Sequence, residues 1–183
     1  MANHQYKKFA TNANDVTIAT MNGRQEIHKQ IAALRSRGGC WKNIRLVATA
    51  EHIGTREGRR IKGIYKVTDE DAIAGVRHDD AVCRANCKLD VHALNPEHNQ
   101  GIEKTKFTTL PYDIPLRALI SADVPNLMMA GRCISGDFYA HSSYRMTGVA
   151  APLGEAAGVA AAIASKRGIN PAQVPFEEIK AKL

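Results

Sequence analysis

The sequence is poor in aromatic side chains, and it lacks the patterns of a secreted or membrane-spanning chain. Aromatic residues make up only 5% of its 183 residues, so a core must rely on aliphatic side chains and methionine. The start of the chain shows no charged-then-apolar signal pattern. The longest apolar stretch, residues 149–164, is interrupted by Pro152 and Glu155, which argue against a membrane span. We therefore expect one compact cytoplasmic unit over residues 1–183.

The four cysteines do not have the spacing of a metal site. Cys83 and Cys87 are separated by three residues, with His78 and His92 nearby, but C-x3-C is not a common zinc pattern and no second pair follows. The sequence predicts no metal and mostly free thiols in a reducing compartment.

The net charge of +7 favours anionic partners, but its distribution argues against nucleic acid. Basic residues are densest over 56–62, where Glu57 interrupts them, and no aromatic residues alternate with them to stack on bases. Arg56 and Arg59 fit either an internal salt-bridge network or a clamp for a substrate carboxylate. Both interpretations stay open.

The first two thirds of the chain predict short mixed elements. Apolar periodicity, glycine pairs and capping residues set their bounds. The expected elements are a strand over 16–19, a helix from Asn22 to Gly38-Gly39, strands over 44–49 and 59–67, a capped helix from Thr68 to about Gly75, an extended segment over 88–92, a surface loop over 95–106 and an extended segment over 107–115.

The last third predicts a strand, a loop and a helix. Residues 126–130 form a short apolar run closed by Gly131, which is typical of a buried parallel strand. A loop over 132–146 leads to a helix over 147–166 that Gly168 ends, and a short helix follows over 176–183. Pro152 should place the regular start of the long helix after Thr147. The pattern indicates an α/β fold.

This strand-loop-helix unit could hold a ligand. Ligands of open α/β sheets lie beyond the carboxyl ends of strands, and Gly131 would permit a close backbone approach. A helix that begins near Thr147 and Gly148 would present free N–H groups to an anion, or to the negative N1–O2 edge of a flavin. Gly154, Gly158 and Ala162 share one face and would allow close packing against a sheet. A tightly packed structural helix without a ligand fits the same pattern.

The expected loop carries His141 and Arg145, four residues apart. In a helical turn they would face the same side. Histidine can act as an acid or base near neutral pH, and arginine can stabilise negative charge. A structural histidine is the alternative.

Several blocks together resemble a known family. They are Ile53–Gly63 followed by Thr68–Asp71, then Tyr112–Ile120, Val124–Ser135, Ala140–Met146 and Leu153–Ala162. From about Asn12 onward, the chain is similar to the carboxy-terminal part of the FAD-dependent oxidoreductase family, which is related to the glutathione-reductase-like flavoproteins.

The resemblance implies the carboxy-terminal portion of an FAD/NAD(P)-binding Rossmann-like fold with part of the substrate domain. Residues 12–122 would be mostly substrate-domain-like, and residues 123–168 would form the strand-loop-helix of the FAD-binding domain. The implied catalytic residues are His141 and Arg145, at the edge of the flavin, with Arg56 and Arg59 on the substrate side. The implied FAD contacts are Gly131, Arg132, Ile134, Ser135, Thr147, Gly148 and Val149.

The chain departs from the family at one motif. The family holds the ADP half of FAD with a strand, a G-x-G-x-x-G turn and a helix, and no segment here matches that pattern. We therefore expect a fragment or a subunit whose partner chain supplies the nucleotide-binding half, with hydride transfer to or from the flavin and a small-molecule substrate. The alternative is a non-catalytic interaction protein that retains the fold. The sequence does not decide the substrate, the electron acceptor or an oligomeric state.

Overall fold

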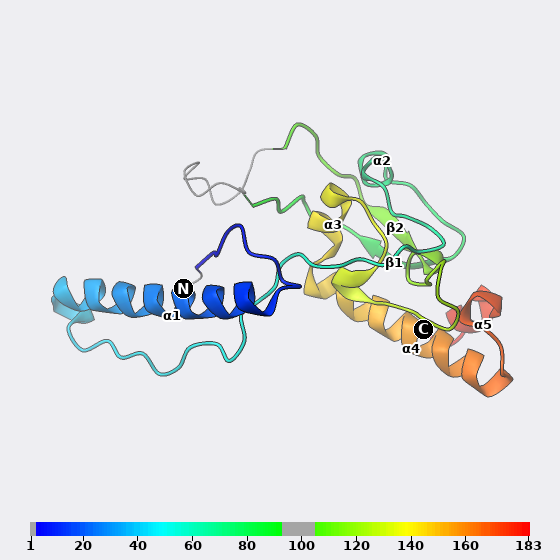
Figure 1. Ribbon diagram of the computed structural model, residues 1–183. Helices are drawn as coiled ribbons and strands as arrows, with labels where there is room; N and C mark the ends of the chain where they lie inside the picture. Colours follow the sequence, from blue (N-terminus) through cyan, green and yellow to red (C-terminus); the bar gives the residue numbers. More distant parts are fainter. Residues whose placement is uncertain (1–2, 93–104) are drawn as a thin grey trace. The chain divides into compact units, whose positions relative to one another are not determined.

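The computed structural model describes residues 3–92 and 105–183, in two compact units (Figure 1). The first unit contains the described residues up to 58, and the second contains residues 59–92 and 105–183. Most of the loop expected over 95–106 lies outside the described residues.

The first unit is dominated by helix α1, Ala13–Ser36. The Asn12 side chain caps it by accepting hydrogen bonds from the backbone N–H groups of Asn14 and Asp15. The helix ends ahead of Gly38 and Gly39, which both have positive φ, and the short 3-10 turn η1, Gly39–Trp41, follows. The expected end of the helix at the glycine pair is confirmed.

Three predictions for the first unit are wrong. Residues 16–19 are helical and not a strand, and Asn22 lies inside α1, because Asn12 provides the cap ten residues earlier. β-branched residues lower helix propensity only slightly, so Val16 to Ile18 do not prevent the helix. Residues 44–49 form no strand: Val47 is 97% exposed, and no described segment pairs with them. A strand needs a partner for its backbone groups.

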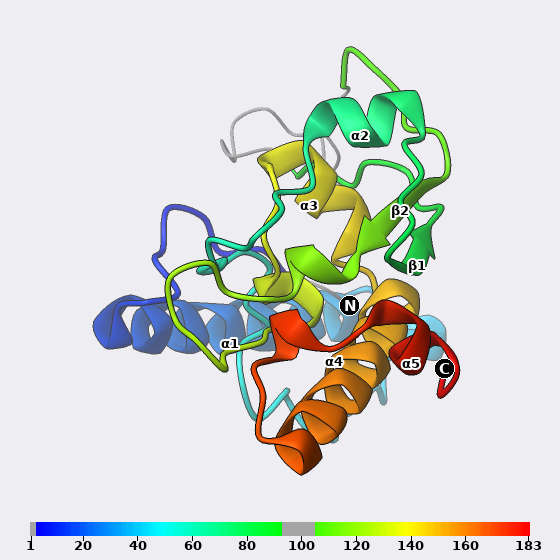
Figure 2. The ribbon, with the colours of Figure 1, turned by 90° about the vertical axis from the view of Figure 1, so that its right-hand side faces the viewer.

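The second unit combines helices with a small antiparallel sheet (Figure 2). Strand β1, Ala81–Ala85, pairs with strand β2, Tyr112–Pro115. Cys83 lies opposite Ile114 and Ala85 opposite Tyr112, and the register shifts between Ala81 and Cys83. The α/β prediction holds at this coarse level. The elements are α2 Asp69–Ala74, β1 Ala81–Ala85, β2 Tyr112–Pro115, α3 Phe138–Tyr144, α4 Thr147–Arg167, α5 Phe176–Lys180 and the 3-10 turns η3 Leu116–Ala118, η4 Gly131–Cys133 and η5 Pro171–Gln173.

Helix α2 forms where the sequence predicts it. The Thr68 side chain accepts from the Asp71 N–H, and the Asp71 carboxylate accepts from the Thr68 N–H, which makes a complete capping box. Gly75, with φ of 67°, ends the helix in the left-handed conformation. The short final helix is also confirmed, as α5.

The expected parallel strand over 126–130 is wrong. Met128 makes a single antiparallel bridge with Ile120, Leu127 is 38% exposed, and Asn126 has a φ of 64°. A buried parallel strand needs parallel neighbours, and the described residues provide only the single antiparallel bridge. The segments 59–67 and 88–92 likewise contain no regular strand. Only the isolated bridges of Gly63 and Val67 occur there.

Helix α4 differs from the prediction at its start. It begins at Thr147 and contains Pro152 in its second turn, so the proline does not delay the helix. The proline lacks the N–H that would bond the Gly148 carbonyl, but Gly148 is exposed and water can reach that carbonyl. Gly168, with φ of 64°, ends the helix as predicted. By length and composition α4 could also cross a membrane, a test that core helices of soluble proteins pass too.

The buried face of α4 is not the glycine face. Gly154, Gly158 and Ala162 are exposed, and a Cβ added at either glycine would meet nothing within 4 Å among the described residues. The expectation that this face packs closely is therefore wrong for the described chain. Larger side chains on the opposite face determine the packing: Val149, Leu153, Ala156, Ala160 and Ala164 are buried.

The second unit has two adjoining apolar clusters. One surrounds Tyr112, Ile114 and Tyr144 and includes the first turns of α4. The other joins the end of α4 to α5 through Ala160, Ala164 and Ile179. Helix α4 thus links both clusters and holds α3 and η4 at its amino-terminal end.

Candidate functional site

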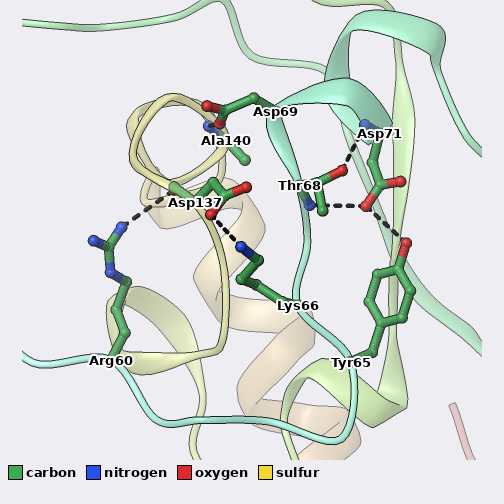
Figure 3. A network of polar contacts seen from close by, with 8 residues as sticks. All are labelled: Arg60, Tyr65, Lys66, Thr68, Asp69, Asp71, Asp137 and Ala140. Atoms are coloured by element: carbon green, nitrogen blue, oxygen red, sulfur yellow. Dashed lines mark hydrogen bonds and ion pairs between the residues drawn. The ribbon is translucent and has the colours of Figure 1, made fainter.

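The site is centred on α3, whose first turn is held by a carboxylate from α2 (Figure 3). Asp137 precedes the helix but makes no side-chain cap. Instead, Asp69 Oδ1 accepts a hydrogen bond from the Ala140 N–H at 2.8 Å. Burial raises the pKa of Asp69, and the Ala140 N–H opposes that rise because it stabilises the charged form. A free backbone donor at the start of α3 is thereby satisfied.

The segment before α2 holds the same end of α3 (Figure 3). Lys66 Nζ lies 2.8 Å from Asp137 Oδ1, and the Arg60 guanidinium donates to the Asp137 carbonyl at 3.2 Å. The Tyr65 hydroxyl donates to Asp71 Oδ2 at 2.8 Å. Burial, and to a smaller extent this hydrogen bond, raises the pKa of Tyr65 to about 12. Residues 60–71 therefore form a polar support for α3.

The other side of α3 is joined to the chain beyond β1. Ser143 Oγ donates to the Cys87 carbonyl at 2.6 Å, and the Asp90 N–H donates to the Ser142 carbonyl at 3.4 Å. Tyr112 Oη in β2 donates to the Ala140 carbonyl at 3.3 Å. Helix α3 is thus held from both sides, which fixes the side chains that it carries.

The two expected catalytic residues lie on this helix. His141 is inside α3, and Arg145 follows it as the C-cap residue, donating its N–H to the His141 carbonyl at 3.1 Å. The expected loop over 132–146 is therefore largely wrong, while the helical-turn arrangement of the pair is confirmed. Both residues are buried: His141 is 1% exposed and Arg145 is 8% exposed. The His141 ring meets the Tyr144 ring edge-on, with 5.3 Å between centroids.

Asp90 and His92 join this pair, and sequence reasoning did not select them for the site. The Arg145 guanidinium donates to the Asp90 carbonyl and lies 3.5 Å from Asp90 Oδ2. His92 Nε2 lies 2.9 Å from the other carboxylate oxygen of Asp90. One signal could have found them: residues two apart in an extended segment point to the same side. Asp90 and His92 have that spacing within the segment expected to be extended.

A second part of the site is the junction between η4 and α4. Gly131 has a φ of 68°, and a Cβ there would lie 3.5 Å from the Ala150 Cβ in the first turns of α4. Thr147 and Gly148 are exposed, and no side chain among the described residues caps this helix start. The structure therefore brings Gly131 together with an open helix amino terminus, as the sequence predicts.

The remaining residues that we expected to contact the cofactor differ in their burial. Arg132 is exposed beside the junction. Ile134 and Val149 lie in the apolar core. Ser135 is buried, and its backbone N–H and carbonyl are bonded to Ala118 and Val67. Among these residues, Arg132 is the one whose side chain faces solvent, and the cofactor roles of all of them stay predictions.

The two expected substrate arginines do not fall in one unit. Arg56 belongs to the first unit and Arg59 begins the second. Both are exposed. Whether they act as a carboxylate clamp or as a structural network stays a prediction.

An open groove of about 630 Å³ lies elsewhere on the second unit, between residues 77–80, η3 and the start of α5. None of the expected site residues lines it. Arg117 on its wall pairs with Asp80 through Nε at 2.9 Å and stands over the Tyr65 ring at 5.1 Å. Burial raises the pKa of Asp80, but the hydrogen bonds and charge of Arg117 outweigh burial and lower it overall. Arg117 and Asp80 on the wall of the groove are thus paired with each other.

The described residues contain no group of three His, Cys, Asp or Glu side chains placed to hold a metal ion. All four cysteines are free thiols.

Comparison with known proteins identifies the family. The model of the FAD dependent oxidoreductase family matches residues 1–183. No curated protein and no solved structure matches the chain. Because the match spans the whole sequence, the chain belongs to the FAD dependent oxidoreductase family, and its cofactor is FAD.

Proposed function

We propose that this chain is the flavin- and substrate-proximal part of an FAD-dependent oxidoreductase of the glutathione-reductase-like type, acting in the cytoplasm. Its Rossmann-like nucleotide-binding half, with the G-x-G-x-x-G turn, would come from a partner chain or an amino-terminal half. The observation that carries the proposal is the exposed start of α4 beside Gly131.

The residues at this junction fit the flavin side of FAD. A helix amino terminus carries roughly half a positive charge, which suits the negative N1–O2 edge of a flavin. Gly131 has a positive φ, which glycine adopts readily, and it has no side chain. A cofactor could therefore approach its backbone closely. The exposed Arg132 adds positive charge beside it. When bound, the flavin would accept or donate a hydride.

Within this proposal, Arg145 supports negative charge and His141 acts as the acid or base. Both side chains are buried in the chain alone. The proposal therefore requires that docking of the nucleotide-binding half gives the reacting atoms access to them. Exclusion of water strengthens the electrostatic effect of Arg145.

Gly148→Asp provides a sharp test. A Cβ added at Gly148 would meet nothing within 4 Å among the described residues, and Gly148 is exposed, so the position has room for a side chain. An acidic residue in the first turn stabilises a helix by about 0.3–1 kcal/mol, but its charge would repel the flavin edge. Gly148→Asp should therefore keep or raise the unfolding temperature and weaken FAD binding about tenfold or more, which corresponds to about 1.4 kcal/mol.

The matched control is Gly158→Asp, since this glycine is also exposed and open but lies about 15 Å further along α4. Flavin absorbance and fluorescence would measure FAD uptake in two samples: the chain alone, and the chain co-expressed with the polypeptide encoded beside it. The control should bind FAD like the unaltered chain. A complex that stays colourless and takes up no FAD, or equal binding by Gly148→Asp, contradicts the proposal.

A non-catalytic interaction protein that retains the fold is the second candidate. The observation that favours it is burial: His141 is 1% exposed, and the Arg145 guanidinium is engaged by Asp90. This candidate predicts a folded chain that stays flavin-free with its partner. His141→Ala would then leave partner binding unchanged in a pull-down, whereas the first proposal predicts loss of flavin reduction.

A further inference from the structure

We propose that residues 44–49 become a β-strand by pairing with an acidic edge strand of the nucleotide-binding half. The inference rests on the proposed function for the identity of the partner. Its structural basis is the backbone, the burial and the charges of the first unit alone. The segment contains none of the residues that we expected to contact the cofactor or the substrate.

The backbone of this segment lacks hydrogen-bond partners. The Ile44 N–H donates to the Trp41 carbonyl at 3.1 Å and so belongs to the turn that follows η1. From Arg45 to Thr49, the described part of the chain provides no partner for any backbone N–H or carbonyl group. A free extended backbone is a template with which another strand can pair.

The side chains of the segment suit a strand. Ile44 and Val47 are β-branched, and such residues favour extended backbone. Ile44 and Leu46 are half-buried while Arg45 and Val47 are exposed, which is the alternation of a strand with two different faces. No residue over 42–53 has a positive φ, so no left-handed residue interrupts the extended path. The segment has the composition and alternation of a strand and lacks a neighbour.

Helix α1 holds the segment at both ends. The Arg35 guanidinium donates to the Ile44 carbonyl at 2.9 Å, and the Arg24 guanidinium donates to the Glu51 carbonyl at 3.3 Å. Because Arg24 and Arg35 are about three helical turns apart, they lie on the same face of α1. The segment thus runs back along this face (Figure 1). Since its ends are already restrained, ordering it against a partner costs less conformational entropy.

The charges along the segment favour an acidic partner over a second copy of this chain. Arg45 lies within it, and the guanidinium groups of Arg24 and Arg35 reach carbonyl groups at its ends. Glu51 is the only acidic residue over 42–53. Two copies that paired here would bring these positive charges together, which is unfavourable, whereas carboxylates on a partner strand would be attracted.

The nucleotide-binding half has the matching architecture. A Rossmann-like half contains an open sheet, and an open sheet ends in edge strands with free backbone groups. An edge strand offers N–H and carbonyl groups at the spacing that another strand requires. The pairing would therefore satisfy the backbone groups that this chain leaves free over 45–49.

Hydrogen–deuterium exchange measures the pairing directly. The samples are the whole chain alone and the chain co-expressed with the polypeptide encoded beside it. In the chain alone, the amides over 45–49 should exchange freely. In the complex, about half of them should exchange about tenfold more slowly or less rapidly still, because alternate N–H groups of a strand point to opposite edges. Unchanged exchange over 45–49 in the complex would overturn the proposal.

Two proline substitutions distinguish strand pairing from a general loss of surface contact. Val47 and Ala48 are both exposed, and the N–H groups of neighbouring strand residues point to opposite edges. Proline removes one N–H, so of Val47→Pro and Ala48→Pro one should weaken the complex about tenfold or more, and the other much less. Each variant is thus the control for the other, and equal affinities of the two would contradict the pairing.

Arg45→Glu tests the charge of the partner. It should weaken the complex about fivefold at low salt and less at high salt. Lys29→Glu is the matched control, because Lys29 is exposed and lies about 140° around α1 from Arg24. Equal effects of the two reversals would rule out an acidic edge. Sedimentation velocity of the chain alone tests the other occupant: a dimer that Val47→Pro or Ala48→Pro dissociates would overturn the proposal in favour of a second copy.

The two proposals fail in different ways. FAD uptake by a complex whose amides over 45–49 exchange freely contradicts only the strand pairing. A flavin-free complex with slowed exchange over 45–49 contradicts the proposed function and supports the pairing. Absence of any complex contradicts both.

Discussion

Replacing Gly136 with alanine tests the packing that supports α3. A Cβ at this position would lie 2.6 Å from Tyr144 Oη and 2.7 Å from Tyr144 Cε1. The Tyr144 side chain is fully buried, and its hydroxyl donates to the Ile134 carbonyl at 3.3 Å. The ring therefore cannot move aside without breaking that bond or displacing its neighbours.

The expected cost of Gly136→Ala is that of overpacking a filled core, about 1–3 kcal/mol. For a chain of this size, each kcal/mol lowers the unfolding temperature by roughly 2–4 °C. The φ of Gly136 is not positive, so the cost is steric and not a backbone strain. Circular dichroism at 222 nm during heating would measure the shift.

A second variant separates the steric cause from a general effect of the substitution. Gly136→Ala combined with Tyr144→Phe removes the 2.6 Å contact to Oη but leaves the 2.7 Å contact to Cε1. The phenylalanine change should therefore restore only part of the lost stability. Gly154→Ala is the control: its Cβ meets nothing within 4 Å, and alanine should stabilise the exposed helix position by about 0.5–1 kcal/mol. An unfolding temperature for Gly136→Ala equal to that of the unaltered chain would refute the packing described here.

Two further predictions concern stability. Gly131→Ala should lower the free energy of unfolding by about 1–2 kcal/mol, because a φ of 68° is strained for alanine. The nearest side-chain atom would lie 3.5 Å from the added Cβ, so the cost is not steric. An unchanged stability in thermal unfolding would contradict the left-handed conformation. Arg117 lowers the pKa of Asp80, so the pair stabilises the folded chain above the ordinary carboxyl pKa, and that contribution is lost as the pH falls below about 4 towards the lowered value. Asp80→Asn should therefore lose less stability than the unaltered chain between pH 6 and pH 3 in urea unfolding, and equal losses would show that the pair contributes nothing to acid sensitivity.

The elements predicted well from sequence are those that local chemistry specifies. The capping box of Thr68 and Asp71 and the left-handed Gly75 lie within a few residues of one another and require no distant partner. The same holds for the end of α4 at Gly168. Such signals act through the backbone groups next to them, so the sequence contains them completely.

The strands were predicted poorly because their formation depends on partners. The apolar runs over 44–49 and 126–130 look like strands, yet the first pairs with no described segment and the second makes only one isolated bridge, from Met128 to Ile120. Conversely, β1 was missed, and it forms because residues distant in the sequence, in β2, satisfy its backbone. Periodicity alone does not reveal such a partner.

The site shows the same division between local and tertiary information. Sequence patterns were sufficient to identify the family, the helical spacing of His141 and Arg145, and the glycine that lies beside the start of α4. The fold was needed to show that His141 and Arg145 are buried, that Ile134 and Val149 belong to the core, and that Asp90 pairs with Arg145. Spacing along a helix is a property of the local chain, whereas burial and charge pairing depend on which distant segments fold against it.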